Sequence, residues 1–556
     1  MLKKKKNRIF LIVLAVLIGF VLILNTNLES ILKDYIATEL DVIGMQNEHT
    51  LGIGDVDVHF FRGNISVTDF YFKPNDELFA SFAYGETAHD AKHQVFVSKI
   101  SLSGLELFKL IVKREVILDK IEIEELNFNF YQSKKENQVH EITKGKKPAF
   151  SLDSIRLSGI DKIELAEIEI ANYGVHILDA SEVDTLSSYA GKDFLIKGLE
   201  MDALKGKQGY FRFDNSALEM ELIQQQYQLE DGLYAASFDN LQYSYQKQKV
   251  QLINFEFKPI ISRAAFASKF SHIYSINEAT IDTLLISGID SYALIHSGVL
   301  SIQQLEIIGL NSSIFMDKSK PWDVEKVTDL PQMALEKMRQ PLHLGKIKVH
   351  NSSFTYSEKL QHTEELVKVN FENLQSEVSF ITSIHDSLQS KKSLKVKLSA
   401  DLLNTLPFSM DITMPYNTAD HSFYASGYTK GITNFKNLNP TIFPAIGMKF
   451  KNGEFDGVTF KVQGNPNRMT GELTMLYQDL EVEVFKKNKS ENKKVSWIAN
   501  TFMKRSNPNK RGKTIVAGID FKRIKYKGFA NYIWKSVESG IVNSLNPIGK
   551  HKKENK

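Results

Sequence analysis

The sequence predicts a mainly β protein: an elongated, curved antiparallel β-sheet groove built from repeated bulged strands, with one N-terminal transmembrane helix and a C-terminal amphipathic helix. Three observations support this prediction. Apolar and polar residues alternate in many stretches, as they do in a strand with one apolar face. An uninterrupted apolar run follows a basic N-terminus. A helical pattern of apolar residues lies near the C-terminus.

One apolar pattern recurs along the chain: two apolar residues at alternate positions, a two-residue gap, then two more at alternate positions. Its complete copies begin at Ile65, Ile100, Ile121, Phe194, Val250 and Met475. A two-residue gap would turn the second pair to the other face, because side chains alternate with a period of two. A β-bulge that absorbs one extra residue cancels this turn and bends the strand.

The gap residues are compatible with bulges: Thr68-Asp69, Ser103-Gly104, Glu124-Glu125 and Lys197-Gly198. Two short strands joined by a tight turn are the alternative. In either case the chain makes curved β-structure with one apolar side, and many such strands side by side would form a continuous apolar concave face.

The N-terminus predicts a membrane anchor. Lys3 to Lys6 and Arg8 precede an uninterrupted apolar run from Ile9 to Leu24. As a helix this run is about 24 Å long, and flanking lysines can extend it to a hydrocarbon core of about 30 Å. Since the basic residues lie on the N-terminal side, the N-terminus should stay cytoplasmic and the rest be exported. A cleavable signal peptide is the alternative.

The composition is that of a folded chain, with 42% hydrophobic and 24% charged residues among 556. There is no cysteine, which excludes a disulfide framework and thiol chemistry. We expect seven segments: a cytoplasmic basic stub (1–8), a transmembrane anchor (9–25), a juxtamembrane helix (26–44), a first β-groove module (45–249), a second β-groove module (250–413), a C-terminal β segment (414–485) and a basic tail with an amphipathic helix (486–556).

The two modules are expected to be copies of each other. Three apolar positions recur 184 residues later: Ile100, Ile121 and Ile163 correspond to Leu284, Leu305 and Ile347. Two excursions from the sheet, Ser133–Pro148 and Lys318–Pro341, occupy corresponding places. Chance matches between period-two patterns are the alternative. A true duplication predicts a repeating β-architecture extended along one axis.

The section from 414 to 485 is punctuated by glycine and proline. Asn439-Pro440 and Pro444 are expected to break any regular element. The glycines of the segments 453–457 and 464–471 are expected to mark short hairpins.

The tail from 486 to 556 is strongly basic, with 19 Lys and Arg against 4 Asp and Glu, a balance of +15. Since the whole chain carries +3, residues 1–485 carry −12. Apolar residues four apart predict one amphipathic helix between Gly528 and Asn546: Phe529, Ile533, Val537, Ile541 and Leu545.

This helix suits an anionic membrane surface or an acidic partner. Its candidate docking residues are Phe529, Tyr532, Ile533, Trp534, Lys535 and Val537. Packing of the helix on the end of the sheet, with its lysines in solvent, is the alternative.

The sequence contains no catalytic signature. His89 and His93 have a metal-like spacing but lack the intervening Glu of a zinc protease helix. Paired carboxylates such as Glu122 and Glu124 alternate with apolar residues and therefore belong to the wet face of a strand. We expect no enzyme activity, no metal, no cofactor and no nucleic-acid partner.

Four stretches carry a resemblance to a known family: FFRGNISVTDFYFKP (60–74), PLHLGKIKVHNSSFTY (341–356), LNPTIFPAIGMKFKNGEFDGVTFKVQGN (438–465) and GELTMLYQDLEVEVF (471–485). Together with the single N-terminal anchor they resemble the AsmA-like family of Gram-negative envelope proteins. The resemblance implies a long β-groove in the periplasm, held by the inner membrane. It also implies an apolar interior and a role in phospholipid transport or outer-membrane biogenesis. It implies no catalytic residues.

The candidate lining of the groove consists of the inward residues of the repeated pattern: Ile65, Val67, Phe70, Phe72, Ile121, Ile123, Leu126, Phe128, Leu305, Ile307, Ile347, Val349 and Phe354. We expect them to bind acyl chains of phospholipid or another lipid, with weak headgroup selectivity. The basic tail is expected to meet a membrane or an envelope protein. The alternative is a non-catalytic envelope scaffold or assembly factor whose apolar face is closed by its own packing.

Overall fold

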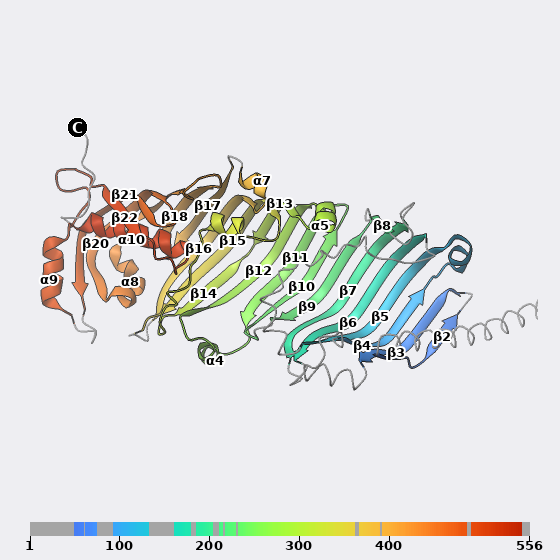
Figure 1. Ribbon diagram of the computed structural model, residues 1–556. Coiled ribbons are helices and arrows are strands. Elements are labelled where there is room, and N and C mark those ends of the chain that lie inside the picture. Colours follow the sequence, from blue (N-terminus) through green and yellow to red (C-terminus); the bar gives the residue numbers. More distant parts are fainter. Residues whose placement is uncertain are drawn as a thin grey trace, which may run out of the picture. The chain divides into compact units, whose positions relative to one another are not determined.

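The computed structural model describes residues 49–59, 62–74, 93–132, 161–179, 185–203, 211–214, 217–229, 232–361, 366–389, 392–485 and 491–546. Strands hold 62% of these residues and helices 16%, which confirms the predicted mainly β class. The chain divides into two compact units between Leu252 and Ile253, and Figure 1 labels most of their strands. The anchor expected at 9–25 and the helix expected at 26–44 lie outside the described residues.

The first unit is a sheet of mostly long strands: β1 (His49–Gly52), β2 (Val56–His59), β3 (Asn64–Pro74), β4 (His93–Ser103), β5 (Glu115–Gln132), β6 (Lys162–Asp179), β7 (Thr185–Ala203), β8 (Phe211–Asp214), β9 (Glu219–Gln228) and β10 (Tyr234–Ser244). Strands β1 and β2 both pair with β3. From β3 the pairing runs through β4, β5, β6, β7 and β9 to β10, and β8 also pairs with β7. A short helical turn, η2 (Lys109–Lys113), joins β4 to β5.

The second unit continues with strands and short helices. Its strands are β12 (Tyr274–Ile289), β13 (Leu300–Ile308), β14 (Asn311–Asp317), β15 (Leu342–Lys359), β16 (Leu366–Thr382), β17 (Ser393–Leu402), β18 (Leu406–Pro415), β19 (Phe423–Asn434), β20 (Met448–Gly464), β21 (Arg468–Val484) and β22 (Ala517–Lys522). Strand β11 (Lys249–Pro259) carries the boundary between the units. The helices are α4 (Arg263–Ser268), α5 (Ser291–Ser297), α6 (Pro331–Glu336), α7 (His385–Leu388), η4 (Phe435–Leu438), α8 (Asn439–Ile446), α9 (Lys493–Phe502) and α10 (Phe529–Leu545).

Most pairings are antiparallel, as expected, but three of the described ones are parallel: β5–β6, β13–β15 and β14–β15. A parallel neighbour requires a long connection, because the chain must return to the end where the first strand began. The segments 133–161 and 318–341 supply these connections. The predicted antiparallel sheet is therefore confirmed for most pairings and wrong at these two places.

The two units share part of a pairing pattern, and the duplication stays a prediction. In the first unit an antiparallel pair, β4–β5, is followed by the parallel pair β5–β6. In the second unit β12 pairs antiparallel with β13 and β14, and both pair in parallel with β15. The antiparallel register repeats at 184 residues: Leu102 lies opposite Ile121, and Ile286 lies opposite Leu305. The parallel register does not repeat, because Ile121 lies opposite Ile168 but Leu305 opposite Ile347.

The predicted gaps coincide with left-handed backbone. Asp69, Glu125, Gly104 and Gly198 all have φ between +50° and +72°. Strands β3, β5 and β7 continue through their gaps, so the alternative of two strands joined by a turn is wrong there. At Gly104 the chain leaves the sheet instead, because β4 ends at Ser103.

The expected extra residue of a bulge is absent from these gaps in the first unit. The pairs Thr68–Lys99 and Phe70–Val97 flank the gap of β3 without a change of register. The direction of the side chains reverses at the same level of the sheet in neighbouring strands. The strands therefore keep their register, and the apolar residues on both sides of the gap stay on one face. In the second unit register shifts do occur, for example between Lys430 and Thr433 in the β19–β20 pairing.

Replacement of Gly198 by alanine is expected to destabilise the first unit. A left-handed conformation costs a non-glycine residue about 1–2 kcal/mol, and a Cβ here would lie 2.5 Å from the carbonyl oxygen of Ala217. Gly232→Ala is the matched control, because its φ is +61° but no atom lies within 4 Å of the added carbon. Thermal unfolding followed by far-UV circular dichroism should show a larger loss for Gly198→Ala. Equal losses would contradict the described packing.

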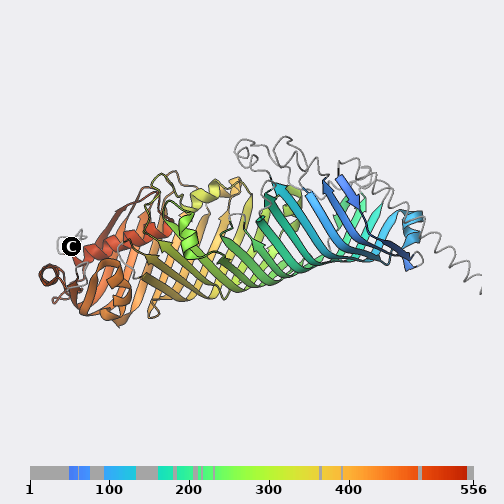
Figure 2. The ribbon, with the colours of Figure 1, turned by 90° about the horizontal axis from the view of Figure 1, so that it is seen from below.

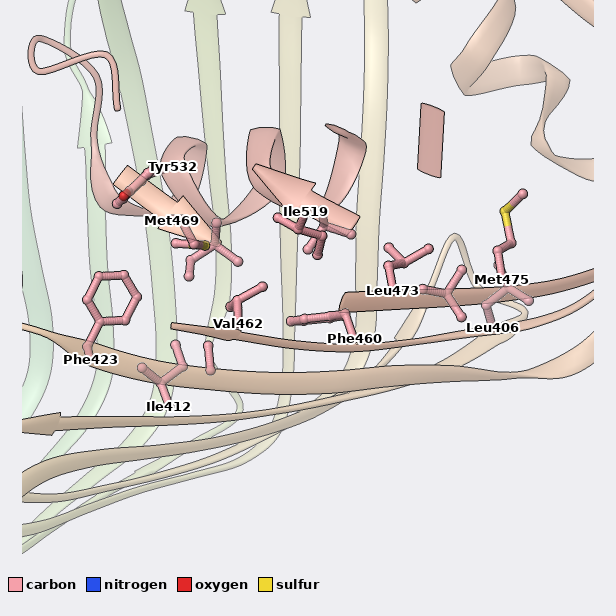
Figure 3. Packing of buried hydrophobic residues seen from close by; sticks show 14 of the residues in the cluster. Leu406, Ile412, Phe423, Phe460, Val462, Met469, Leu473, Met475, Ile519 and Tyr532 are labelled. Atoms are coloured by element: carbon pink, nitrogen blue, oxygen red, sulfur yellow. The ribbon is translucent and has the colours of Figure 1, made fainter. Parts of the chain in front are cut away.

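The C-terminal part of the second unit contains a closed hydrophobic core. Strands β17 to β22, helix α10 and the segment before β15 contribute its buried residues. Figure 3 shows side chains from β18, β20, β21, β22 and α10 gathered in one cluster, among them Ile412, Phe460, Leu473, Ile519 and Tyr532. Helix α10 lies against β21 and β22 (Figure 2).

Two expectations for residues 438–471 were wrong. Asn439-Pro440 and Pro444 do not break the structure but belong to α8. Pro440 is tolerated because the first turn of a helix needs no N–H donor there. The glycines of segment 453–457 lie inside β20, where the register with β21 shifts. The glycines of segment 464–471 do flank a hairpin turn, between β20 and β21.

Candidate functional site

Apolar side chains form unbroken rows across the strands of the first unit. Residues directly opposite each other in neighbouring strands lie on the same face of a sheet. One row crosses eight strands, from β2 to β10: Val58, Ile65, Leu102, Ile121, Ile168, Ile196, Met220 and Tyr243. A second row runs beside it: Val56, Val67, Ile100, Ile123, Ile170, Phe194, Leu222 and Leu241. We call this side the apolar face of the first unit.

The opposite face of the same strands is charged. Lys120, Glu167, Lys197 and Glu219 form a row of alternating charge across β5, β6, β7 and β9. The ammonium nitrogen of Lys120 lies 3.5 Å from Glu167, and that of Lys197 lies 3.6 Å from the same carboxylate. This face is therefore adapted to water, and the two faces differ sharply in chemistry.

The first apolar row of the first unit is largely half-buried. From Ile65 to Tyr243 every member of the first row is half-buried, and the edge residue Val58 alone is buried. Exposed apolar surface costs about 25 cal/mol per Å², and contiguous exposed patches usually mark binding surfaces. A face of this kind can receive an apolar ligand.

A polar cluster interrupts the apolar face at one place. Gln225 on β9 is 1% exposed and accepts a hydrogen bond of 2.5 Å from the hydroxyl of Tyr173 on β6. It lies across Gly191 of β7, where a Cβ would come within 2.3 Å of the Gln225 amide oxygen. Burial raises the pKa of Tyr173, so its hydroxyl stays protonated. Gly191 is thus the residue that makes room for a buried amide.

In the second unit the corresponding row changes from half-buried to buried along the sheet. The row consists of Ile286, Leu305, Ile347, Val378, Val396, Ile412, Ala425 and Val462. The first five are half-buried, whereas Ile412, Ala425 and Val462 belong to the closed core. This row is thus half-buried over β12 to β17 and buried over β18 to β20.

Two elements supply the cover. Helix α10 places Ile533 and Val537 in the core. The segment between β14 and β15 contributes Leu330, which is fully buried, and α6. This segment, one of the two expected excursions, also meets the C-terminal chain: the N–H of Thr328 donates to the carbonyl of Lys525 at 2.9 Å.

Most of the predicted lining residues are in register with one another across neighbouring strands, so they share one face of the sheet in each unit. In the first unit Ile65, Val67, Phe70 and Phe72 on β3 are joined through β4 to the predicted residues of β5, namely Ile121, Ile123, Leu126 and Phe128. In the second unit Leu305 and Ile307 on β13 lie directly beside Ile347 and Val349 on β15. Of all these residues only Val349 is buried.

Phe354 stands apart from the second-unit rows. It lies opposite Ser312 of β14 and Phe371 of β16. Its ring centroid is 6.0 Å from that of Phe371, which in turn lies 6.0 Å from Phe408. These three rings extend across β15, β16 and β18 as an aromatic group of the same sheet.

Sequence reasoning missed several members of the first-unit rows on β6, β9 and β10. Ile168, Ile170, Met220, Leu222 and Tyr243 belong to them but were not named as candidates. Their strands alternate plainly, so the signal was present. Which of their faces joins that of β5 depends on the parallel β5–β6 register, which no local pattern encodes.

The predicted docking residues of α10 are largely occupied by the protein itself. The helix begins at Phe529 and ends at Leu545, as expected. Tyr532, Ile533 and Val537 are buried in the core, and the ring of Phe529 lies 5.2 Å from that of Phe423. Trp534 is 54% exposed, and Lys535 pairs with Glu538 at 2.6 Å. Only the outer side of the helix is open to a partner.

Comparison with known proteins gave no match to a family model and none to a curated protein. Among the helices that the structure describes, none is long and apolar enough to cross a bilayer. The described residues contain no group of metal-ligating side chains, and His89, one of the two histidines with metal-like spacing, lies outside them.

Proposed function

We propose that the apolar face binds acyl chains of phospholipid or another lipid. The observation that carries this proposal is the pair of eight-strand apolar rows in the first unit, half-buried on one face of a sheet whose other face is charged. An acyl chain laid on the rows would remove apolar surface from water, while its headgroup could stay in solvent at the edge of the sheet.

The apolar face carries few polar side chains, which favours a lipid over a polar ligand. Apart from Gln225 and Tyr173, the two rows and their neighbours present aliphatic and aromatic side chains. Small-molecule sites with polar specificity need several convergent donors and acceptors. We therefore expect weak selectivity among headgroups.

The proposal also includes the cellular location and the role of the protein. The basic stub and apolar run of residues 1–25 support an inner-membrane anchor with the bulk of the chain in the periplasm. The four stretches that resemble the AsmA-like family support a part in phospholipid transport or outer-membrane biogenesis. A chain of this kind would act without a catalytic residue and without a cofactor.

An envelope scaffold is the second candidate function. The closed core of the second unit favours it, since the apolar face there is covered by α6 and α10. The first unit does not share this feature in its described residues, because its rows stay half-buried. The two functions therefore make different predictions for the first unit.

Site-specific photo-crosslinking in the full-length chain tests the proposal. A benzoylphenylalanine at Ile123 is expected to crosslink to radiolabelled phospholipid, because this side chain lies on the apolar face. The matched control is Glu122, the adjacent residue of the same strand, which faces the other side between Ser101 and Glu169. Crosslinking at both positions alike, or at neither in a folded protein, would exclude the apolar face as a lipid site.

A further inference from the structure

The chain after β21 follows the free edge of that strand. Strand β22 pairs only with Arg468–Leu473 of β21. The N–H of Leu480 donates to the carbonyl of Arg505 at 2.8 Å, and Tyr477 and Asn507 exchange backbone hydrogen bonds of 2.9 and 3.0 Å. We call residues 491–516 the edge strip.

Helix α9 covers the far end of this edge with polar side chains. The N–H of Val482 donates to Asn500 Oδ1, and Asn500 Nδ2 donates to the carbonyl of Val482, both at 2.8 Å. The N–H of Val484 donates to Ser496 Oγ at 2.8 Å. Free strand edges attract other chains, and these side chains satisfy the edge instead.

Two apolar residues of α9 are exposed to solvent. Trp497 is 68% exposed and Val495 40% exposed. A tryptophan in this position adds nothing to the hydrophobic core. Tryptophan is enriched where proteins meet the headgroup region of a membrane.

The edge strip is also strongly basic. Residues 491–516 contain seven Lys and Arg and one acidic residue, Glu491. Six of the seven are exposed: Lys493, Lys494, Arg505, Lys510, Arg511 and Lys513. Hydrogen bonds to β21 hold the strip along one edge as far as Asn507, and Asn507 in turn bonds Ile515, so the segment with Lys510, Arg511 and Lys513 lies between two fixed points.

We propose that the edge strip docks on the surface of an anionic phospholipid bilayer, with Trp497 at the headgroup level and the Lys and Arg side chains on lipid phosphates. The combination of an exposed tryptophan with flanking cations fits a membrane interface better than an acidic protein, which would be matched by charge alone. This docking is separate from the apolar face, because it uses the edge of β21 and not a face of the sheet.

Vesicle flotation of the full-length protein tests the docking. Vesicles of phosphatidylcholine that contain phosphatidylglycerol as the anionic lipid are compared with vesicles of pure phosphatidylcholine. Insertion of a hydrophobic segment into the bilayer would contribute equally to the binding of both kinds of vesicle. We expect the protein to prefer anionic vesicles, and the preference to fall as salt screens the charges.

The variant Lys510→Ser/Arg511→Ser/Lys513→Ser is expected to lose about 100-fold of this preference, since each basic residue near a charged surface contributes roughly fivefold. The control Lys395→Ser/Lys397→Ser/Lys461→Ser removes the same charge from exposed positions of β17 and β20 and should lose much less. Trp497→Ser should weaken binding to both compositions.

Equal losses in the two triple variants would overturn the proposal, since the effect would then follow net charge alone. So would capture by polyglutamate in the absence of any vesicle preference, which would assign the edge strip to an acidic protein. An unchanged fluorescence spectrum of Trp322 and Trp534 in Trp497→Ser verifies that this variant is folded.

Discussion

Replacing Phe128 with glutamate is expected to reduce the acyl lipid that co-purifies with the protein at least tenfold, while leaving the protein folded. Phe128 is half-buried on β5, in register with Val95 of β4 and Val175 of β6 on the apolar face. An ionised carboxylate there would have to give up water against each bound acyl chain, which is strongly unfavourable. Native mass spectrometry with lipid extraction gives the number of lipids per protein.

Asn127→Glu is the control for this experiment. Asn127 is exposed, precedes Phe128 in the same strand and lies opposite Phe96 on the other face. It receives the same charge without touching the rows, so its lipid content should equal that of the wild type. If Phe128→Glu unfolds the protein, the residue is ordinary core. If it folds and keeps its lipid, acyl chains lie elsewhere.

The substitution Leu473→Ala is expected to destabilise the second unit by about 2–5 kcal/mol, the range for a large-to-small change in a closed core. Leu473 is 1% exposed on β21 and packs beside Ile519 and Gly540. Leu305→Ala, at a half-buried position of the same unit, should cost about 1 kcal/mol because less apolar surface is removed from contact.

Urea unfolding followed by tryptophan fluorescence measures this difference directly. All three tryptophans of the chain, Trp322, Trp497 and Trp534, belong to the second unit, so the signal reports on that unit alone. Similar losses for both variants would mean that the apolar face over β13 is as closed as the C-terminal core.

Local pattern was sufficient for the features that depend on neighbours in sequence. The alternation around Ile121 and Phe128 predicted β5, and its gap at Glu124-Glu125 predicted an irregularity, which is a left-handed residue and not the expected bulge. The four-residue spacing from Phe529 to Leu545 gave both ends of α10. These signals are strong because each is repeated several times within one element.

Features set by distant contacts were not predictable. The parallel register of β5 and β6 is fixed by which strands meet, and the same alternation fits either direction. The sequence of α9 has apolar residues at helical spacing, Val495, Ile498 and Phe502, but no local pattern shows that Ser496 and Asn500 bind strand backbone. The sequence also left open whether α10 packs on its own sheet or faces a partner, because this too depends on distant contacts.

The direction of the apolar rows has a consequence for motion. Neighbouring strands are about 4.8 Å apart, so a molecule moving along the row from Ile65 to Tyr243 would meet a new hydrocarbon group at each strand step. From Ile65 to Met220 every position offers an aliphatic side chain of nearly the same chemistry. The energy profile along the row is therefore shallow. Such a track favours one-dimensional diffusion over long residence, with Gln225 and Tyr173 beside it as a local obstacle or resting place.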